Sequence, residues 1–265
     1  MRRNEKMTLR KYINKQHSND RREAKLVYKA RLREARATHK IRMEEYYLKT
    51  GAARPIDPPY RPILEEVGNS VTHGLGSIFA IVAFVLMLLA SDTAREYVSA
   101  SIYFFGMFTM FTVSCLYHAL PHGGAAKRLF RRFDYSSIYL LIGATFAPTL
   151  ACVFTDTFGL VFFIIQWAVI AMGITLVGVY GPSKLRYIHI PLYVVLGWSA
   201  LMLLPRMITF NFPLGMWILA GGVIYSIGIV PYALKTKVSH FVWHFFVLAG
   251  AVVQWIGIYF YLYLA

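Results

Sequence analysis

Long apolar runs separated by short polar segments occupy the chain from residue 63 to its end. A helix needs roughly 20 mostly apolar residues to cross a bilayer. Seven runs meet this requirement, and they predict membrane helices over residues 70–90, 97–119, 134–154, 158–180, 189–205, 213–233 and 240–263. The connections between them are too short for another folded domain. The pattern therefore predicts an all-α, seven-helix membrane bundle over residues 63–265.

Formal charge is concentrated ahead of the bundle. Residues 1–62 hold 18 of the 28 Lys and Arg residues and 7 of the 13 Asp and Glu residues, a net charge of +11. The other 203 residues carry the remaining 10 basic and 6 acidic residues, whereas about a quarter of a soluble domain is charged. This composition excludes a soluble domain, and the apolar, aromatic content excludes disorder.

Residues 1–62 form a basic extension that ends in a linker with prolines at 55, 58, 59 and 62. Residues 21–49 have a helix-forming composition. Two roles remain open for this segment: a solvated helix near anionic lipid headgroups, or a docking site for a protein partner. No nucleic-acid motif accompanies the charge, so nucleic acid is not an expected partner.

The distribution of Lys and Arg between the loops predicts the orientation. With a cytoplasmic N-terminus the inner segments carry 26 of these residues and the outer segments carry 2. The positive-inside rule therefore predicts a multi-pass cell-membrane protein with its N-terminus in the cytoplasm and its C-terminus outside. Cys115 and Cys152 lie in apolar runs and support no disulfide framework. The first apolar run begins only near Val71, so we expect no cleavable signal peptide.

Ionisable side chains inside membrane helices are costly, so each is a candidate functional residue. The predicted topology places six of them at one depth near the cytoplasmic side, on five helices: His73, His118, Asp134, His189, His240 and His244. A random distribution would use both leaflets. We therefore expect these residues to include a functional site.

The spacing of His240 and His244 puts two imidazoles on one helical face. Alone, such a pair is as compatible with two hydrogen-bonded histidines as with a metal site. His118 offers a third nitrogen, and three histidines favour zinc over calcium or magnesium. Three protein ligands plus water is the pattern of catalytic zinc, in which bound water has a pKa of about 7, while four protein ligands form structural sites.

Asp134 and Ser114 are candidate partners of this site. Asp134 could cap a helix or pair with a neighbouring arginine, and it could also deprotonate a metal-bound water. Ser114 lies one turn before His118, where it could bond its own helix backbone or support the metal site.

Glu66, Asn69 and His73 follow one helical stripe. For Glu66 and Asn69 a capping or interfacial role competes with support of the site. His73 lies about a turn deeper, where it could act as a proton shuttle or as a partner of the ligands. We expect His122 and His189 to lie outside the chemistry.

The same residues form motifs that resemble those of a known superfamily. Glu66-Val-Gly-Asn69-Ser-Val-Thr-His73, Ser114-Cys-Leu-Tyr-His118 with the downstream Asp134, and His240-Phe-Val-Trp-His244 resemble the three signatures of the hemolysin III and progestin and adipoQ receptor superfamily. The resemblance covers residues 63–265, and the short loops are similar to the bacterial hemolysin III branch. The basic N-terminus is not part of the signatures.

The resemblance implies a seven-helix bundle with zinc bound by His118, His240 and His244. Asp134 would then contact zinc through water, and Ser114 would support it. Relatives in the superfamily are associated with hydrolysis of lipid amides such as ceramide and with membrane lipid homeostasis. Three functions are compatible with this: a zinc-dependent hydrolase of membrane lipids, a sensor or receptor with structural zinc, and a pore-forming cytolysin. Nearly uncharged spans argue against the pore, and the sequence does not predict an oligomeric state.

Overall fold

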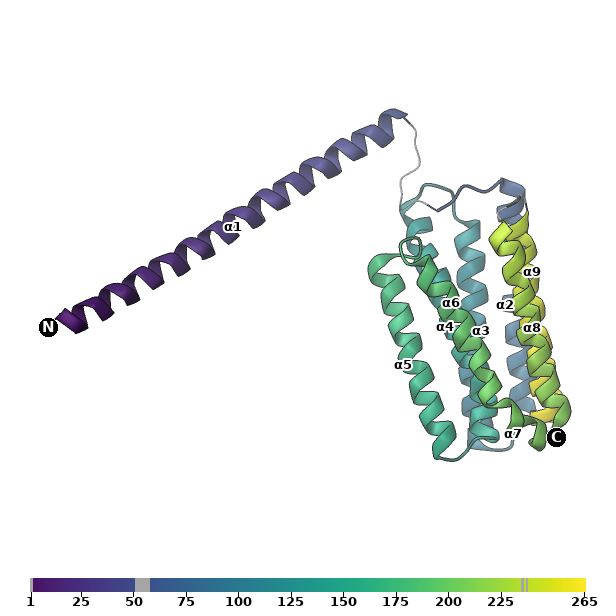
Figure 1. Cartoon of the computed structure of the whole chain (residues 1–265). Helices are drawn as coiled ribbons and strands as arrows, with labels where there is room; N and C mark the ends of the chain where they lie inside the picture. The colour runs from purple at the N-terminus through teal and green to yellow at the C-terminus, as the bar shows by residue number, and fades with distance from the viewer. Residues whose placement is uncertain (1, 51–57, 235, 237) are drawn as a thin grey trace. The chain divides into compact units, whose positions relative to one another are not determined.

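A computed structural model describes residues 2–50, 58–234, 236 and 238–265 of the chain. All the regular elements among these residues are helices (Figure 1). They are α1 Arg2–Thr50, α2 Ile63–Leu89, α3 Ala94–Ala119, α4 Ala125–Cys152, α5 Thr157–Tyr180, α6 Arg186–Trp198, η1 Ser199–Met202, α7 Leu204–Phe210, α8 Phe212–Leu234, α9 Ser239–Ile258 and the π-helical turn η2 Tyr259–Tyr263. The all-α prediction is confirmed.

Helix α1 and the bundle that begins before α2 are separate units. In α1 the described side chains are exposed or half-buried, and charged residues lie on every side. A helix was expected over residues 21–49, and the structure extends it in both directions. In the bundle, α3 packs on α2 and α4, α9 packs on α2 and α8, and α5 covers α4 (Figure 1).

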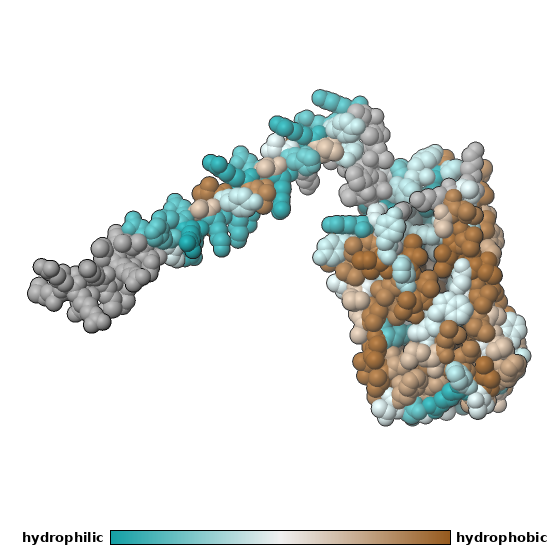
Figure 2. Space-filling model, in the orientation of Figure 1, coloured by the Kyte–Doolittle hydropathy of each residue, from teal (hydrophilic) through white to brown (hydrophobic). Residues whose placement is uncertain are grey.

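The flank of the bundle is apolar, as a lipid-facing surface must be. Figure 2 shows hydrophobic side chains covering the visible flank, while the drawn side chains of α1 are mostly hydrophilic. Val71 and Leu75 on α2 and Ile165 on α5 are among the exposed large apolar residues. Six helices among the described residues are long and apolar enough to cross a membrane, and the number is seven if the bent pair of α6–η1 with α7 is one span. This supports a multi-pass membrane protein.

The bent span corrects the expected straight helix over residues 189–205. Helix α6 passes into the 3-10 turn η1, and α7 then continues at a bend of 45°. Pro205 lies in the first turn of α7, where its missing N–H cannot extend the preceding helix. The expected loop from Arg206 to Phe212 is therefore mostly helical.

Helices α2 and α4 begin earlier than expected. Helix α2 begins at Ile63 rather than 70, and α4 begins at Ala125 rather than 134. Their first turns carry charged residues, which a search for apolar runs omits, because such a search finds the hydrocarbon-spanning part of a helix only. Glu66 and Lys127 therefore lie within helices α2 and α4 of the bundle.

Tight helix contacts depend on small residues. A Cβ on Gly106 of α3 would lie 2.3 Å from the Cβ of Ala144 on α4, so these two helices approach closely. A Cβ on Gly221 of α8 would lie 2.2 Å from Cγ of Gln254 on α9. Gly221 therefore serves packing within the bundle, whereas a Cβ on its neighbour Gly222 would meet open space.

Candidate metal centre

Three histidine side chains from two helices converge at the end of the bundle where α2 begins. His118 lies in the last turn of α3, and His240 and His244 lie one turn apart at the start of α9. Their candidate ligand nitrogens all lie within 4.8 Å of one another. The Nε2 atoms of His240 and His244 are 3.2 Å apart. The predicted convergence of these three residues is thus present in the fold.

The chemistry of this cluster suits a metal ion. His118 and His244 are 2% and 0% exposed, and Nε2 of His118 has no hydrogen-bond partner among the residues that the structure describes. A buried polar atom without a hydrogen-bond partner lowers the stability of the fold, so such an atom normally has a protein group, a water molecule or an ion as its partner. Neutral imidazole nitrogens are ligands of zinc and related transition metals. The cluster could therefore hold a metal ion.

The other ring nitrogen of His118 is held by residues on α2. The Glu66 carboxylate contacts Nδ1 of His118 through Oε2, and the Asn69 amide nitrogen lies 3.3 Å from the same Nδ1. Metal-binding histidines almost always donate their second N–H to a carboxylate or a similar acceptor, which orients the ring. Glu66 therefore fits the supporting role better than the capping role that the sequence left open, whereas the Asn69 amide nitrogen is itself a donor and cannot accept this N–H.

Lys127 completes this arrangement, and the sequence reasoning missed it. Its ammonium donates to Oε1 of Glu66 at 2.8 Å and to the carbonyl of Leu120 at 2.9 Å. Its side chain is only 1% exposed. From sequence, Lys127 counted only as one of the positive charges in a loop, and no spacing linked it to Glu66 on another helix.

His73 packs directly against one candidate ligand. Its ring stacks on that of His244, with the centroids 3.8 Å apart and the planes at 30°. Neither ring nitrogen of His73 has a hydrogen-bond partner in the part of the chain that the structure describes. The structure thus places His73 beside the cluster, and its role in proton transfer remains a prediction.

Asp134 and Ser114 also face this region. Both line the cavity described below, and the Ser114 side chain interacts with the Asp134 carboxyl group. Because α4 begins at Ala125, Asp134 lies in the third turn of the helix and cannot be its N-cap. That alternative was wrong, since the apolar run that placed a helix start at residue 134 began after the true start.

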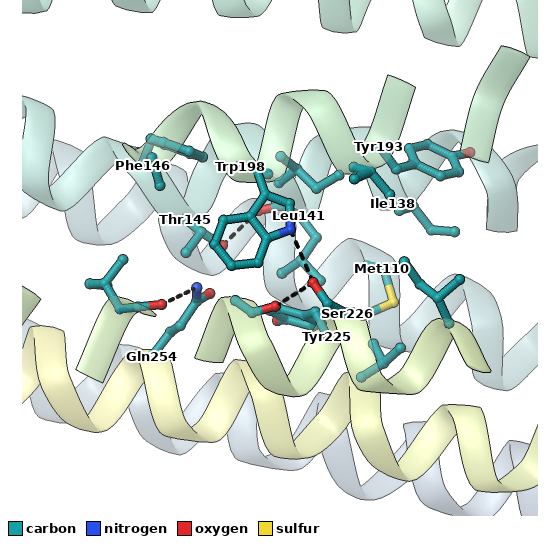
Figure 3. Close-up of a pocket in the computed structure, with 18 of the residues that line it drawn as sticks. Met110, Ile138, Leu141, Thr145, Phe146, Tyr193, Trp198, Tyr225, Ser226 and Gln254 are labelled. Carbon is teal, nitrogen blue, oxygen red and sulfur yellow. Dashed lines mark hydrogen bonds between the residues drawn. The ribbon is translucent and has the colours of Figure 1, made fainter. Parts of the chain in front are cut away.

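A cavity of about 200 Å³ extends from this polar end into the bundle. His73, Asp134 and His240 line one end, and Thr149, Met207 and Gln254 lie farther along it. From Asp134 to Thr149 helix α4 rises by about 22 Å. Figure 3 shows part of the cavity wall, in which apolar side chains such as Leu141 and Phe146 lie beside Trp198, whose indole N–H donates to the hydroxyl of Ser226 at 3.0 Å.

Two of the remaining histidines lie outside the cluster, as expected. His189 is fully buried on α6, and its Nδ1 forms a 2.9 Å hydrogen bond with the hydroxyl of Tyr139. His122 lies in the segment between α3 and α4, with its ring centroid 5.6 Å from that of Tyr60. His189 shares the predicted depth of the cluster but faces α4 instead.

Comparison with known proteins identifies the group to which these features belong. Residues 62–255 match the family described as haemolysin-III related. The chain is 30% identical over 207 residues to Hemolysin-3 of Bacillus cereus, an alignment that covers 75% of this chain and 92% of that protein. It is 28% identical over 204 residues to the Hemolysin-3 homolog of Bacillus subtilis, covering 75% and 95%. It is also 29% identical over 217 residues to the human monocyte to macrophage differentiation factor, covering 79% and 90%.

Proposed function

Since the chain belongs to the haemolysin III-related family, we propose that it is a zinc-dependent membrane hydrolase that cleaves an amide or ester bond of a membrane lipid. The observation that carries this proposal is that His240, one member of the histidine cluster, lines the polar end of a mostly apolar cavity together with His73 and Asp134. Apolar walls suit an acyl chain, and convergent polar groups at one end suit the bond that joins the chain to its headgroup.

His118, His240 and His244 would hold the zinc ion, because their nitrogens converge and the side chains of His118 and His244 are buried. When bound, zinc would supply Lewis-acid chemistry to a carbonyl group and to water. Asp134 would accept the proton of the attacking water and return it to the leaving group. Ser114 would orient the Asp134 carboxylate, and His73 would relay protons between this region and the water beyond it.

The orientation of the chain decides which leaflet supplies the substrate. The excess of Lys and Arg in the predicted inner segments supports a cytoplasmic N-terminus. The histidine cluster would then lie in the inner leaflet of the cell membrane, and a lipid would enter the cavity from that leaflet. Anionic headgroups of the same leaflet would attract the basic residues of α1.

A sensor or receptor with structural zinc is the second candidate. The support that Glu66 and Lys127 give to His118 favours it as much as it favours a hydrolase, because a structural ligand also needs a fixed ring. A pore-forming cytolysin, suggested by the names of the Bacillus relatives, receives less support, because an apolar cavity does not replace the hydration shell of an ion.

Lipid turnover by the purified protein in nanodiscs separates these candidates. Ceramides and acyl phospholipids would be supplied to the wild type, to Asp134→Asn and to a His240→Ala, His244→Ala double variant, and released fatty acid would be measured by mass spectrometry. A hydrolase predicts release by the wild type, zinc without release for Asp134→Asn, and neither for the double variant.

Two outcomes would oppose the proposal. Full turnover in Asp134→Asn would remove the assignment of Asp134 as the base. A zinc-loaded wild type that cleaves no lipid, together with unfolding of the double variant, would leave the zinc as a structural element of a sensor.

A further inference from the structure

An 11-residue repeat runs along helix α1. Residues 22–32 read REAKLVYKARL, and residues 33–43 read REARATHKIRM. Five positions are identical in the two copies, and a sixth exchanges Lys25 for Arg36. Eleven residues make about three turns of an α-helix, so equivalent positions return to nearly the same face.

The repeat sorts side chains into adjacent stripes. Leu26, Ala30, Ala37 and Ile41 fall within an arc of about 60°, and all four are exposed in the described helix. Leu26 and Ile41 are each 61% exposed, and Glu44 lies at the same angle around the helix as Leu26. We call this face the apolar stripe of α1.

Opposite charges border the two sides of the apolar stripe. Glu23, Glu34 and Glu45 recur at intervals of 11 residues along one border. Arg22, Lys29 and Arg33 follow the other border, about 100° around the helix from the acidic residues. One flank is therefore acidic and the other basic, although α1 as a whole has 16 basic and 6 acidic residues.

We infer that the apolar stripe of α1 binds the α1 helix of a second copy of the chain, in parallel orientation. When two parallel helices meet through one stripe, the left flank of each faces the right flank of the other, as the e and g positions of a parallel coiled coil do. Acidic flanks then meet basic flanks on both sides. In an antiparallel pair each flank would face its own kind, which is repulsive for both.

The same periodicity determines the shape of the pair. An 11-residue repeat corresponds to 3.67 residues per turn, slightly more than the 3.6 of a straight helix, and it produces a gentle right-handed supercoil. Alanines at 30 and 37 let the two backbones approach closely.

The expected strength is modest for α1 alone. Exposed ion pairs contribute about 0–1 kcal/mol each, so the flanks choose the orientation rather than drive the association. Four stripe residues, two of them alanines, bury little area, and the net charge of the helix opposes pairing. Each α1 is attached to a membrane bundle, however, and attachment raises the effective concentration of one helix near another. This inference does not depend on the proposed hydrolase.

Disulfide trapping in the full-length protein tests the pairing directly. The background carries Cys115→Ser and Cys152→Ser, and single cysteines replace Ala30, Ala37 or Ala35. Ala35 lies on the opposite face of the same helix and is the matched control. Oxidation in membranes of the expressing cells should link Ala30→Cys and Ala37→Cys chains roughly tenfold faster than Ala35→Cys chains, because only the stripe positions are held together.

Charge exchange tests whether the charged flanks contribute to the pairing. Changing Glu23, Glu34 and Glu45 to Lys should reduce trapping of Ala37→Cys to the Ala35→Cys rate. Changing Arg22, Lys29 and Arg33 to Glu should do the same, and coexpression of the two charge variants should restore trapping between them.

Three results would overturn the inference. Equal rates at all three cysteine positions would mean that chains meet only by random collision. Trapping at Ala37 but not at Ala30 would contradict the parallel register. The third result has two parts. The chain with Glu23, Glu34 and Glu45 changed to Lys is trapped as fast as the parent, and α1 in reconstituted vesicles is protected from protease only when phosphatidylglycerol is added to phosphatidylcholine. Together they would mean that α1 binds an anionic lipid surface instead.

Discussion

Replacing Glu66 with Gln tests how the candidate metal centre is held together. The Glu66 carboxylate contacts Nδ1 of His118 and accepts a 2.8 Å hydrogen bond from Lys127. The amide of Gln keeps the shape of the side chain but removes its charge. It leaves the Lys127 ammonium buried without a counter-charge and weakens the hold on the His118 ring.

The size of the effect follows from the role of such supporting groups. Loss of a partner that orients a metal-binding histidine costs about 10–100-fold in metal affinity, which corresponds to about 1.4–2.7 kcal/mol of binding free energy. We therefore expect Glu66→Gln to bind zinc 10–100-fold more weakly than the wild type. Glu66→Gln combined with Lys127→Met should recover part of the loss, because it removes the unpaired buried ammonium.

Competition with a chromogenic zinc chelator measures the affinity of the purified protein in detergent. Cobalt(II) in place of zinc gives an absorption spectrum that reports the ligand geometry. A general loss of stability would leave this spectrum unchanged in the folded fraction of the protein, whereas a displaced His118 ring would change it. Glu65→Gln is the matched control, because Glu65 is adjacent but pairs with Arg61 at 3.8 Å instead. Wild-type affinity and an unchanged cobalt spectrum in Glu66→Gln would refute the supporting role.

Three further predictions concern the cavity, the packing of the helices and the ion pair between Asp156 and Arg206. Gly222→Leu should abolish binding of a fluorescent fatty acid without unfolding the protein, because a side chain at Gly222 enters open cavity space. Gly76→Ala should lower stability by about 1–3 kcal/mol, because the new Cβ would lie 2.5 Å from the ring of Phe111. The thermal midpoint in detergent measures this loss, and Gly222→Ala is the control that should leave the midpoint unchanged. A hydrogen bond from Arg206 holds the pKa of Asp156 below its ordinary value. The ion pair between the two side chains therefore makes a small contribution to stability that is present above the ordinary pKa and is lost as the pH falls through the lowered one. If Asp156→Asn leaves the acid dependence of the thermal midpoint unchanged, this expectation is contradicted.

The hydrophobic pattern was sufficient to predict the architecture. Twenty-residue apolar runs have few alternatives to membrane helices, and the six long helices and the bent pair follow the seven predicted runs. The break between α6 and α7 was not predictable from the run of residues 189–205, because Pro205 is compatible with both a helix end and a bend. The N-terminal helix was predicted from its composition, although its 11-residue order was not used.

The sequence was sufficient to group the three histidines and to place Glu66 and Ser114 among their candidate partners, but not to find Lys127. His118, His240 and His244 could be grouped because membrane depth and helical spacing both constrain them. Depth does not determine which way a helix is rotated, so His189 could not be separated from the cluster by depth alone. Lys127 and Glu66 lie on different helices and are 61 residues apart in the chain. No local periodicity in the sequence indicates such a pair.

The metal content of the purified protein tests the central claim most directly. Zinc would be measured by mass spectrometry for the wild type and for the His240→Ala, His244→Ala double variant, with folding checked by circular dichroism. The account predicts about one zinc per wild-type chain, as a three-histidine site holds a single ion, and none in the double variant. A folded wild type that remains metal-free after equilibration with zinc would contradict it.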